Sequence, residues 1–194
     1  MNNDFLNYRK MLNEALDTVD QEWLSMMKNE MVRLAMSHYP LFVCGNGGSA
    51  AIAEHLSCDH NKGVCSDTNL NPYIISLGSN VSLITAIAND IGYEEIFSKQ
   101  LEIFGNDRSG LLVISSSGNS PNIVNALKAA KKANMSTMAM VGFDGGAAKD
   151  LASVSVHVNS NNYGVVEDCH QILMHSIAQS IRMQYAFKNA KLKL

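Results

Sequence analysis

The residues best placed for chemistry form a run of hydroxyl side chains at the end of an apolar segment. The apolar run 111–114 leads directly into three serines, then into Gly-Asn-Ser and Pro121. Pro121 suits the first position of a helix, because the N–H group that it lacks would have no partner there. A strand that delivers hydroxyl groups to a helix N-terminus favours an anion, through unpaired N–H groups and the helix dipole. The sequence therefore predicts a site for the phosphate group of a small molecule.

A second turn of the same kind lies upstream. The short apolar run 41–44 is followed by Gly-Asn-Gly-Gly-Ser at 45–49 and then by a helix-forming segment. This turn has neither the Gly-x-Gly-x-x-Gly spacing of dinucleotide-binding folds nor the Lys-Ser/Thr pair of a P-loop, so neither function is supported. One such turn is equally well explained as an ordinary strand-to-helix connection. Two of them, both rich in serine and asparagine, favour a phosphate site.

Two helical segments each carry a histidine and an acid. His55 and Asp59 are four residues apart and so share one face of a helix. Glu167 and His175 are two turns apart on the last helix. An imidazole and a carboxylate from each helix can close a tetrahedral zinc site, although such pairs are also common as surface ion pairs. Neighbouring residues with suitable ligand atoms are Cys58, His60, Asp168, Cys169 and His170.

Composition limits the class of protein. The chain has 194 residues, enough for one domain with a substantial core, and a formal net charge of −3. The lack of a basic stripe argues against a nucleic-acid partner, and no apolar run approaches the roughly 20 residues that span a bilayer. The N-terminus shows no signal-peptide pattern, and the four cysteines show no Cys-x-x-Cys spacing. We therefore expect a cytoplasmic protein with reduced thiols that binds neither nucleic acid nor membranes.

The order of segments predicts an α/β fold. Residues 4–37 carry apolar side chains at helical intervals and form one or two helices, which either pack on their own domain or serve as an oligomer contact. Short strands then alternate with helices, which implies a parallel sheet with helices on both faces. The strands are expected at 41–44, 73–77, 111–115, 137–141 and 154–158, and the helices at 49–60, 81–88, 94–104, 123–133, 147–151 and 165–186.

We therefore predict one domain over residues 1–194. It is a three-layer sandwich around a central five-stranded parallel sheet, with 1–37 as a helical extension and 38–194 as the α/β core. Ligands bind beyond the carboxyl ends of the strands in such sheets, and both serine-bearing turns lie at such ends.

Six segments occur in an order specific enough to identify a resemblance. They are CGNGGSAA, AEHLSCDH, TAIANDIGYEEIFSKQL, LLVISSSGNSPNIVNALKAAK, VGFDGG and a last helix that carries His175. Across nearly the whole chain they resemble the phosphoheptose isomerases, which are the sedoheptulose 7-phosphate isomerase branch of the sugar isomerase (SIS) domain family. The resemblance implies the flavodoxin-like SIS sandwich with a long N-terminal helix. It also implies a homotetramer with sites at subunit interfaces.

The resemblance assigns roles to individual residues. The residues that it implies around the sugar phosphate are Asn46, Gly47, Ser49, Ser115, Ser116, Ser117 and Ser120. Asn89 and Asp90 match a pair that lies near the substrate, and Glu167 also faces it. The implied ligands of one Zn²⁺ per subunit are His55, Asp59, Glu167 and His175. Asp59 is then the catalytic base and His175 the acid partner.

Four positions depart from the family pattern. Asp59 stands where the family usually has glutamate, and Glu167 where it usually has glutamine. Gly63 replaces a common arginine, with Lys62 the nearest cation, and Gly164 replaces an expected aspartate. Each departure touches the sugar or the metal, whereas the phosphate turn is intact. A phosphosugar ligand is therefore expected, and the particular sugar is left open.

The implied reaction is an aldose–ketose isomerisation by a zinc-dependent enzyme. It converts sedoheptulose 7-phosphate to D-glycero-D-manno-heptose 7-phosphate, for lipopolysaccharide or capsule heptose synthesis. Such a reaction needs a base, an acid and an electrophile for the carbonyl oxygen, and zinc can be that electrophile. Two alternatives stay open: an isomerase for a different phosphosugar, or a non-catalytic SIS protein that binds a replication initiator. The retained His175 counts against the second.

Overall fold

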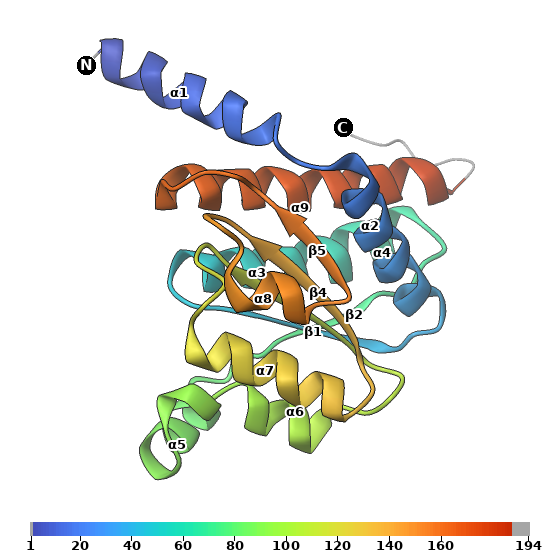
Figure 1. Ribbon diagram of the computed structural model, residues 1–194. Coiled ribbons are helices and arrows are strands. Elements are labelled where there is room, and N and C mark those ends of the chain that lie inside the picture. Colours follow the sequence, from blue (N-terminus) through green and yellow to red (C-terminus); the bar gives the residue numbers. More distant parts are fainter. Residues whose placement is uncertain (1, 188–194) are drawn as a thin grey trace.

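The computed structural model describes residues 2–187, with Asn2 described by its backbone alone. Five parallel strands form one sheet in the order β2-β1-β3-β4-β5 (Figure 1). The strands are β1 Pro40–Gly45, β2 Tyr73–Ser76, β3 Gly110–Ser115, β4 Ser136–Val141 and β5 Val154–His157. The expected flavodoxin-like parallel sheet is therefore confirmed, and its strand order reverses between β1 and β3, where folds of this type bind ligands.

The strands are continuous apolar runs because both faces of the sheet are covered. All six residues of the central strand β3 are buried. In β1, Leu41 and Val43 pack into one hydrophobic cluster, while Phe42 and Cys44 pack into another on the opposite face. The alternation of side chains along each strand thus divides the core into two parts.

Helices form a separate layer on each face of the sheet (Figure 1). The layer that carries the site contains α2 Gln21–Met36, α3 Gly48–Cys58 and α9 Tyr163–Tyr185. The opposite layer contains α5 Val81–Asp90, α6 Ser98–Phe104, α7 Pro121–Lys132 and α8 Gly146–Leu151. This arrangement confirms the three-layer sandwich. Among residues 2–187, no helix combines the length and the apolar character needed to cross a bilayer.

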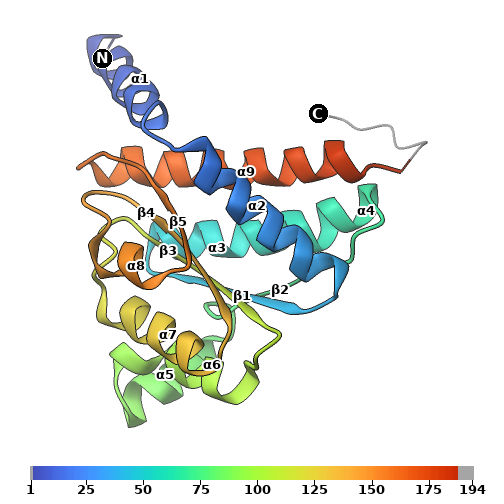
Figure 2. The same cartoon turned by 45° about the vertical axis from the view of Figure 1, so that its right-hand side comes forward.

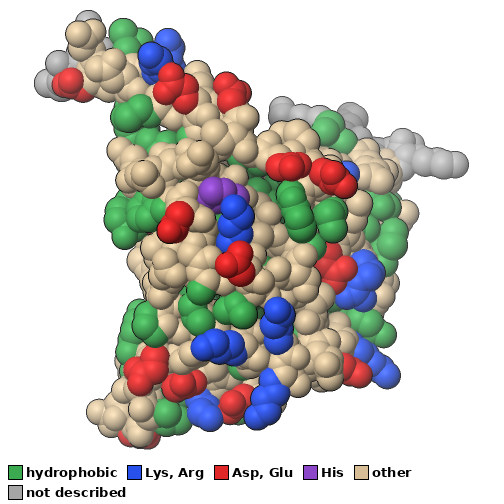
Figure 3. All heavy atoms as spheres, in the orientation of Figure 1, with side chains coloured by type: hydrophobic (Ala, Val, Ile, Leu, Met, Phe, Trp, Pro, Cys, Tyr) green, Lys and Arg blue, Asp and Glu red, His purple; other side chains and the backbone are tan. Residues whose placement is uncertain are grey.

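The N-terminal extension consists of two helices that pack differently. In α2, Asp20 caps the N-terminus by accepting from two backbone N–H groups, and Met27 and Leu34 are buried against the sheet. The preceding helix α1, Asn2–Leu16, projects from the body of the molecule (Figure 2). Figure 3 shows apolar side chains on the surface of this projecting part, and Phe5 is 67% exposed. Both expectations for the extension therefore retain support, since α2 packs on its own domain and α1 leaves an apolar surface free.

A side-chain hydrogen bond helps to fix α1 to α9. The hydroxyl of Tyr8 donates a hydrogen bond to Oδ2 of Asp168 at 2.7 Å. This hydrogen bond, with lesser contributions from burial and nearby negative charge, raises the pKa of Tyr8 to about 12. Tyr8 also lies against Gly164, one of the positions that departs from the family pattern. A Cβ added at Gly164 would lie 3.1 Å from the hydroxyl oxygen of Tyr8.

The helix expected at 49–60 continues in a form that the sequence did not predict. After α3 a π-helical segment, η1, runs over Asp59–Val64, followed by a short α4, Cys65–Asp67. Within η1, the side-chain amide of Asn61 donates to the carbonyl of Ile74 at 2.7 Å and accepts from its N–H at 2.9 Å. Ile74 belongs to the edge strand β2, so Asn61 pairs backbone groups that the sheet leaves free. The π-helical turn therefore begins at Asp59 and is fastened to the sheet two residues later.

The expected helix 94–104 was wrong in one respect. It is divided into a 3₁₀ turn, η2 Tyr93–Glu95, and the α-helix α6. Gly92, with a φ of 149°, precedes the turn and redirects the chain. The other helices begin and end within a few residues of their expected limits.

Candidate active site

The two serine-bearing turns line one small cavity. Its volume is about 110 Å³, and its lining comes from the chain directly after β1 and β3 and from α9. We call it the serine cradle; its lining residues are Asn46, Ser49, Ser115, Ser116, Ser117, Ser120, Tyr163 and Glu167. Asn46 and the five serines were expected around the sugar phosphate from the family resemblance. Glu167 was expected at the substrate and the metal, and Tyr163 was not expected.

The hydroxyl groups of the cradle divide into two kinds. Ser115 Oγ accepts from the N–H of Gly118 at 3.1 Å, and Ser117 Oγ accepts from the N–H of Asn119 at 3.3 Å, so both help to fix the turn. Ser116 Oγ is buried and has no hydrogen-bond partner among the described residues. A buried hydroxyl without a partner costs about 1–3 kcal/mol. A phosphate oxygen in the cradle would supply the partner that Ser116 lacks.

Two helix N-termini lie beside the cradle. Ser120 is the N-cap of α7, and Pro121 is the first residue of the helix. The side chain of Ser120 makes no capping hydrogen bond to the described part of the chain. Gly47, which was expected to contact substrate, is the N-cap of α3 and has a φ of 54°, a conformation that glycine adopts readily. The first N–H groups of helices arranged in this way favour a bound anion.

An amide pair holds the two turns together. Asn46 and Asn122 each donate from Nδ2 to the other's Oδ1, both at 2.9 Å. The hydroxyl of Tyr93 donates to the same Oδ1 of Asn46 at 3.1 Å. Sequence reasoning missed Asn122, Tyr93 and Tyr163. The position of Asn122 in the first turn of a helix at the phosphate site was the one available signal.

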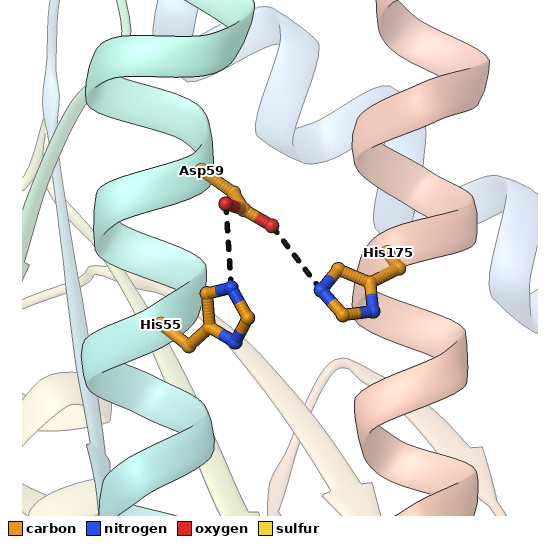
Figure 4. A group of neighbouring side chains, drawn as sticks. All are labelled: His55, Asp59 and His175. Atoms are coloured by element: carbon orange, nitrogen blue, oxygen red, sulfur yellow. Dashed lines mark ion pairs between the residues drawn. The ribbon is translucent and has the colours of Figure 1, made fainter. Parts of the chain in front are cut away.

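Three of the four expected metal ligands lie together on facing helices (Figure 4). His55 comes from α3, Asp59 begins η1, and His175 comes from α9. Nε2 of His55 lies 3.5 Å from Oδ1 of Asp59, and Nε2 of His175 lies 3.4 Å from Oδ2. The two imidazoles meet edge to face, with centroids 4.9 Å apart. We call these three residues the cation triad.

The spacing of the triad fits a small divalent cation. Ligand bonds of 2.0–2.2 Å to zinc place neighbouring ligand atoms of a tetrahedron about 3.4 Å apart. The nitrogen–oxygen separations of 3.5 and 3.4 Å, one to each oxygen of Asp59, are close to this value, and one ligand atom from each residue lies within 4.8 Å of the other two. Two imidazoles and a carboxylate are also a donor set that zinc enzymes use, with a fourth position left for water or substrate. The residues present therefore fit the metal that the resemblance implies.

Glu167 is the expected ligand that lies elsewhere. Its carboxylate lines the serine cradle and packs against Gly48, the first residue of α3, so a side chain at position 48 would collide with it. The physical reason is the helix itself, since eight residues of α-helix separate Glu167 from His175 by about 12 Å along the axis. The structure thus places Glu167 beside the expected substrate phosphate and outside the cation triad.

A residue that sequence reasoning missed stands beside the triad instead. Gln171 precedes His175 by one helical turn, and its Nε2 lies 2.9 Å from Nδ1 of His55 and 3.3 Å from Nε2 of His175. The spacing of four residues from His175 was a signal for this contact.

Asn89, Asp90, His60 and His170 belong to neither the cradle nor the triad. Asn89 and Asp90, at the end of α5, are exposed and hydrogen-bond to each other at 2.8 Å. They do not line the cradle in this structure. His60 and His170 are buried, which lowers the pKa of each to about 4 and holds the rings neutral. Both are therefore core residues and stand outside the triad.

The cradle and the triad are carried by the same two helices. On α3, Ser49 and His55 are separated by six residues, or about 9 Å of helix rise. On α9, Glu167 and His175 are separated by about 12 Å. The two sites therefore lie roughly 10 Å apart along helices that pack against each other.

Comparisons with known proteins identify the family and its fold. The model of the SIS domain family matches residues 5–142. Phosphoheptose isomerase from Helicobacter pylori (strain P12) is 33% identical over 193 residues, covering 96% of either chain. Solved structures of phosphoheptose isomerases from Francisella tularensis and Neisseria gonorrhoeae are similar, with TM-scores of 0.83 and 0.82 at 28% and 30% identity. These similarities cover 94% and 93% of this chain, and 96% and 95% of those chains.

Proposed function

This chain belongs to the SIS domain family, and from that premise we propose that it is a phosphoheptose isomerase. The proposed reaction converts sedoheptulose 7-phosphate to D-glycero-D-manno-heptose 7-phosphate. The observation that carries the proposal is the pairing of two sites on α3 and α9: a hydroxyl-lined cradle for phosphate and, about 10 Å away, a triad with acid–base groups. This separation suits a long sugar with its phosphate at one end and its carbonyl at the other.

The phosphate end holds the substrate. Ser116, with its unpartnered buried hydroxyl, and Ser120, at the N-terminus of α7, supply hydrogen bonds to the phosphate oxygens. The positive ends of α3 and α7 stabilise the anion. Binding energy from this non-reacting group orients the reactive carbons, and so serves the chemical step as well as affinity. Glu167 also lines the cradle, and we assign its carboxylate to the sugar hydroxyls next to the phosphate, because two negative groups in direct contact repel each other.

The triad performs the proton transfers. Asp59 takes the proton from the carbon next to the carbonyl and returns it to the former carbonyl carbon, while His175 protonates the carbonyl oxygen and takes up the proton of the neighbouring hydroxyl. The carbonyl oxygen gains negative charge as the enediol forms. Asp59 is one methylene shorter than the usual glutamate, and a displacement of about 1 Å can cost 100-fold in rate. The start of the π-helical segment η1 at Asp59 supports an adjusted backbone that brings the shorter acid into place.

The proposed metal is one Zn²⁺ per subunit, held by His55, Asp59 and His175. When bound, it supplies an electrophile for the oxygen that accumulates charge. With Glu167 at the cradle, the triad contains one carboxylate, so the site keeps a net positive charge that favours this role.

We further propose a cytoplasmic homotetramer that supplies heptose for lipopolysaccharide or capsule. The exposed apolar side chains of α1, including Phe5 and Met11, support an interface at this helix. An isomerase for a different phosphosugar is the second candidate. Gly63 favours it, because the family pattern places a cation near the substrate at this position and glycine supplies none. The structure has room for a larger residue there, since no atom lies within 4 Å of a Cβ added at Gly63.

A product assay tests the proposal. Purified protein of measured metal content is incubated with sedoheptulose 7-phosphate and with hexose and pentose phosphates, and products are followed by NMR. We expect isomerisation of sedoheptulose 7-phosphate at the highest kcat/KM, lost after metal removal and restored by Zn²⁺. A higher kcat/KM with a shorter sugar would support the second candidate. No turnover of any sugar by zinc-loaded protein would overturn both.

A further inference from the structure

Gln171 lies against the ring nitrogen of His55 that does not face Asp59. His55 presents Nε2 to Asp59 at 3.5 Å and Nδ1 to the amide of Gln171 at 2.9 Å. The ring therefore lies between a carboxylate on one side and an amide on the other. A neutral imidazole carries one proton, so the group facing Nδ1 determines whether Nε2 carries it.

The amide of Gln171 can serve either form of the ring. With its nitrogen toward His55, as in this structure, it can donate to Nδ1 of a neutral ring whose proton is on Nε2, facing Asp59. A half-turn of the amide about its last bond brings Oε1 to nearly the same position. The oxygen then accepts the Nδ1 proton, and Nε2 is free to bind a cation. Metal-binding histidines are commonly oriented in this way, by a carbonyl or carboxylate that accepts the proton of the second ring nitrogen.

The burial and spacing of Gln171 support this role. The residue is half-buried on α9, where it faces the triad, and its position one turn before His175 keeps it on the same face of the helix. Nε2 of Gln171 lies 3.3 Å from Nε2 of His175, so the amide contacts both imidazoles of the triad. Asp59 faces the other nitrogen of His55, Nε2, so the carboxylate does not compete with the amide for Nδ1.

We propose that Gln171 is a positioning residue of the metal site, and that its amide oxygen holds His55 in the form with the proton on Nδ1 when a divalent cation is bound. The inference rests on the proposed function, because it requires that the triad binds a metal. It adds a residue that neither the family resemblance nor the cation triad includes. Gln171 acts through His55 and need not touch the sugar.

Zinc affinity of the full-length protein tests the proposal, measured by competition with a chromogenic chelator. Gln171→Leu removes both polar atoms at similar size, and we expect it to weaken zinc binding about 10- to 100-fold, as for other residues that orient metal ligands. Gln171→Glu keeps an oxygen that can accept the proton, and we expect affinity equal to the wild type or tighter. Gln184→Leu is the matched control on the same helix, since Gln184 is engaged by Lys28, and it should bind zinc as the wild type does.

A spectroscopic readout separates positioning from a general effect on folding. In ¹⁵N NMR of the wild type, added zinc should place the proton of His55 on Nδ1 and shift the signal of Nε2 as the bound nitrogen. Wild-type affinity in Gln171→Leu, or zinc bound through Nδ1 of His55, would overturn the inference while leaving the isomerase proposal intact. A wild-type protein that binds no zinc would overturn both the inference and the metal part of the proposed function.

Discussion

At the scale of single residues, Ser116 shows how a site can be recognised from an incomplete hydrogen-bond network. Its hydroxyl is buried at the end of β3 and lacks a partner among the described residues, although most buried polar side chains in proteins are paired. The neighbouring serines Ser115 and Ser117 instead use their oxygens to hold the turn. We interpret the unpaired hydroxyl as a cost to the free protein that the substrate phosphate removes.

Replacement of Ser116 by alanine should therefore separate activity from stability. Loss of a hydrogen bond to a charged group is worth about 1.5–3 kcal/mol, so kcat/KM for sedoheptulose 7-phosphate should fall about 10- to 100-fold. The free energy of unfolding should not fall, because no hydrogen bond within the protein is lost. Ser155→Ala, at another buried and unpartnered hydroxyl outside the cradle, is the control and should leave kcat/KM unchanged. Equal kinetics for Ser116→Ala and the wild type would remove Ser116 from the phosphate site.

The buried ring of His170 predicts a pH dependence of stability. Burial lowers its pKa to about 4, whereas an unfolded histidine titrates near 6.5. As the pH falls from about 6.5 to 4, the imidazole of His170 is therefore protonated in the unfolded chain and stays neutral in the folded chain. Over this range the residue lowers the free energy of unfolding by about 1.4 kcal/mol per pH unit.

Urea unfolding of the wild type and of His170→Leu at pH 7.5 and pH 5 measures this contribution. We expect the stability difference between the two proteins to shift by about 2 kcal/mol in favour of the variant at pH 5. A difference that is the same at both pH values would contradict a neutral, buried His170.

At the scale of elements, the sequence predicted the strands well because each is a short apolar run bounded by polar turns. Burial on both faces dictates such runs, and the two serine-bearing turns lie at strand ends, so the cradle was also predictable. The π-helical segment η1 was not, because it depends on Asn61 meeting the edge strand β2, a contact that helical periodicity does not report. Glu167 was predicted at both the substrate and the metal, and it lies at the cradle and outside the triad. The metal role overlooked the roughly 12 Å of rise between Glu167 and His175.

Asn61 should accordingly be more important for stability than an exposed asparagine. Asn61→Ala removes two hydrogen bonds to the backbone of Ile74. The N–H of Ile74 is left unpaired, while the hydroxyl of Ser57 still donates to its carbonyl, so the free energy of unfolding should fall by about 1–3 kcal/mol. Asn29→Ala, at an exposed position of α2, should change it by less than about 0.5 kcal/mol. Chemical denaturation of both variants provides the comparison, and equal stabilities would show that Asn61 does not fasten η1.

At the scale of the whole molecule, α1 is the part that a single chain does not explain. It projects from the sandwich, and Phe5 and Met11 are exposed on it (Figure 2). Exposed apolar surface of this kind commonly marks an interface. Its attachment through Tyr8 and Asp168 brings α1 to the same helix, α9, that carries both sites. An assembly through α1 would therefore bring a neighbouring subunit close to the site.

The mass of the protein in solution tests this assembly. We expect light scattering to give four times the chain mass of 21.1 kDa. The double variant Phe5→Glu, Met11→Glu should dissociate while its far-UV circular dichroism stays that of a folded chain. A monomeric wild type would contradict the proposed tetramer, and a double variant that remains tetrameric would place the interface elsewhere.

The account as a whole depends on one ligand spanning the serine cradle and the cation triad. The most direct measurement is a crystal structure of the zinc-loaded protein with sedoheptulose 7-phosphate. The account predicts phosphate oxygens within hydrogen-bond distance of Ser116 and Ser120, and the carbonyl end of the sugar beside Asp59, His175 and the metal. A phosphate bound outside the cradle, or a sugar whose carbonyl end points away from the triad, would contradict it.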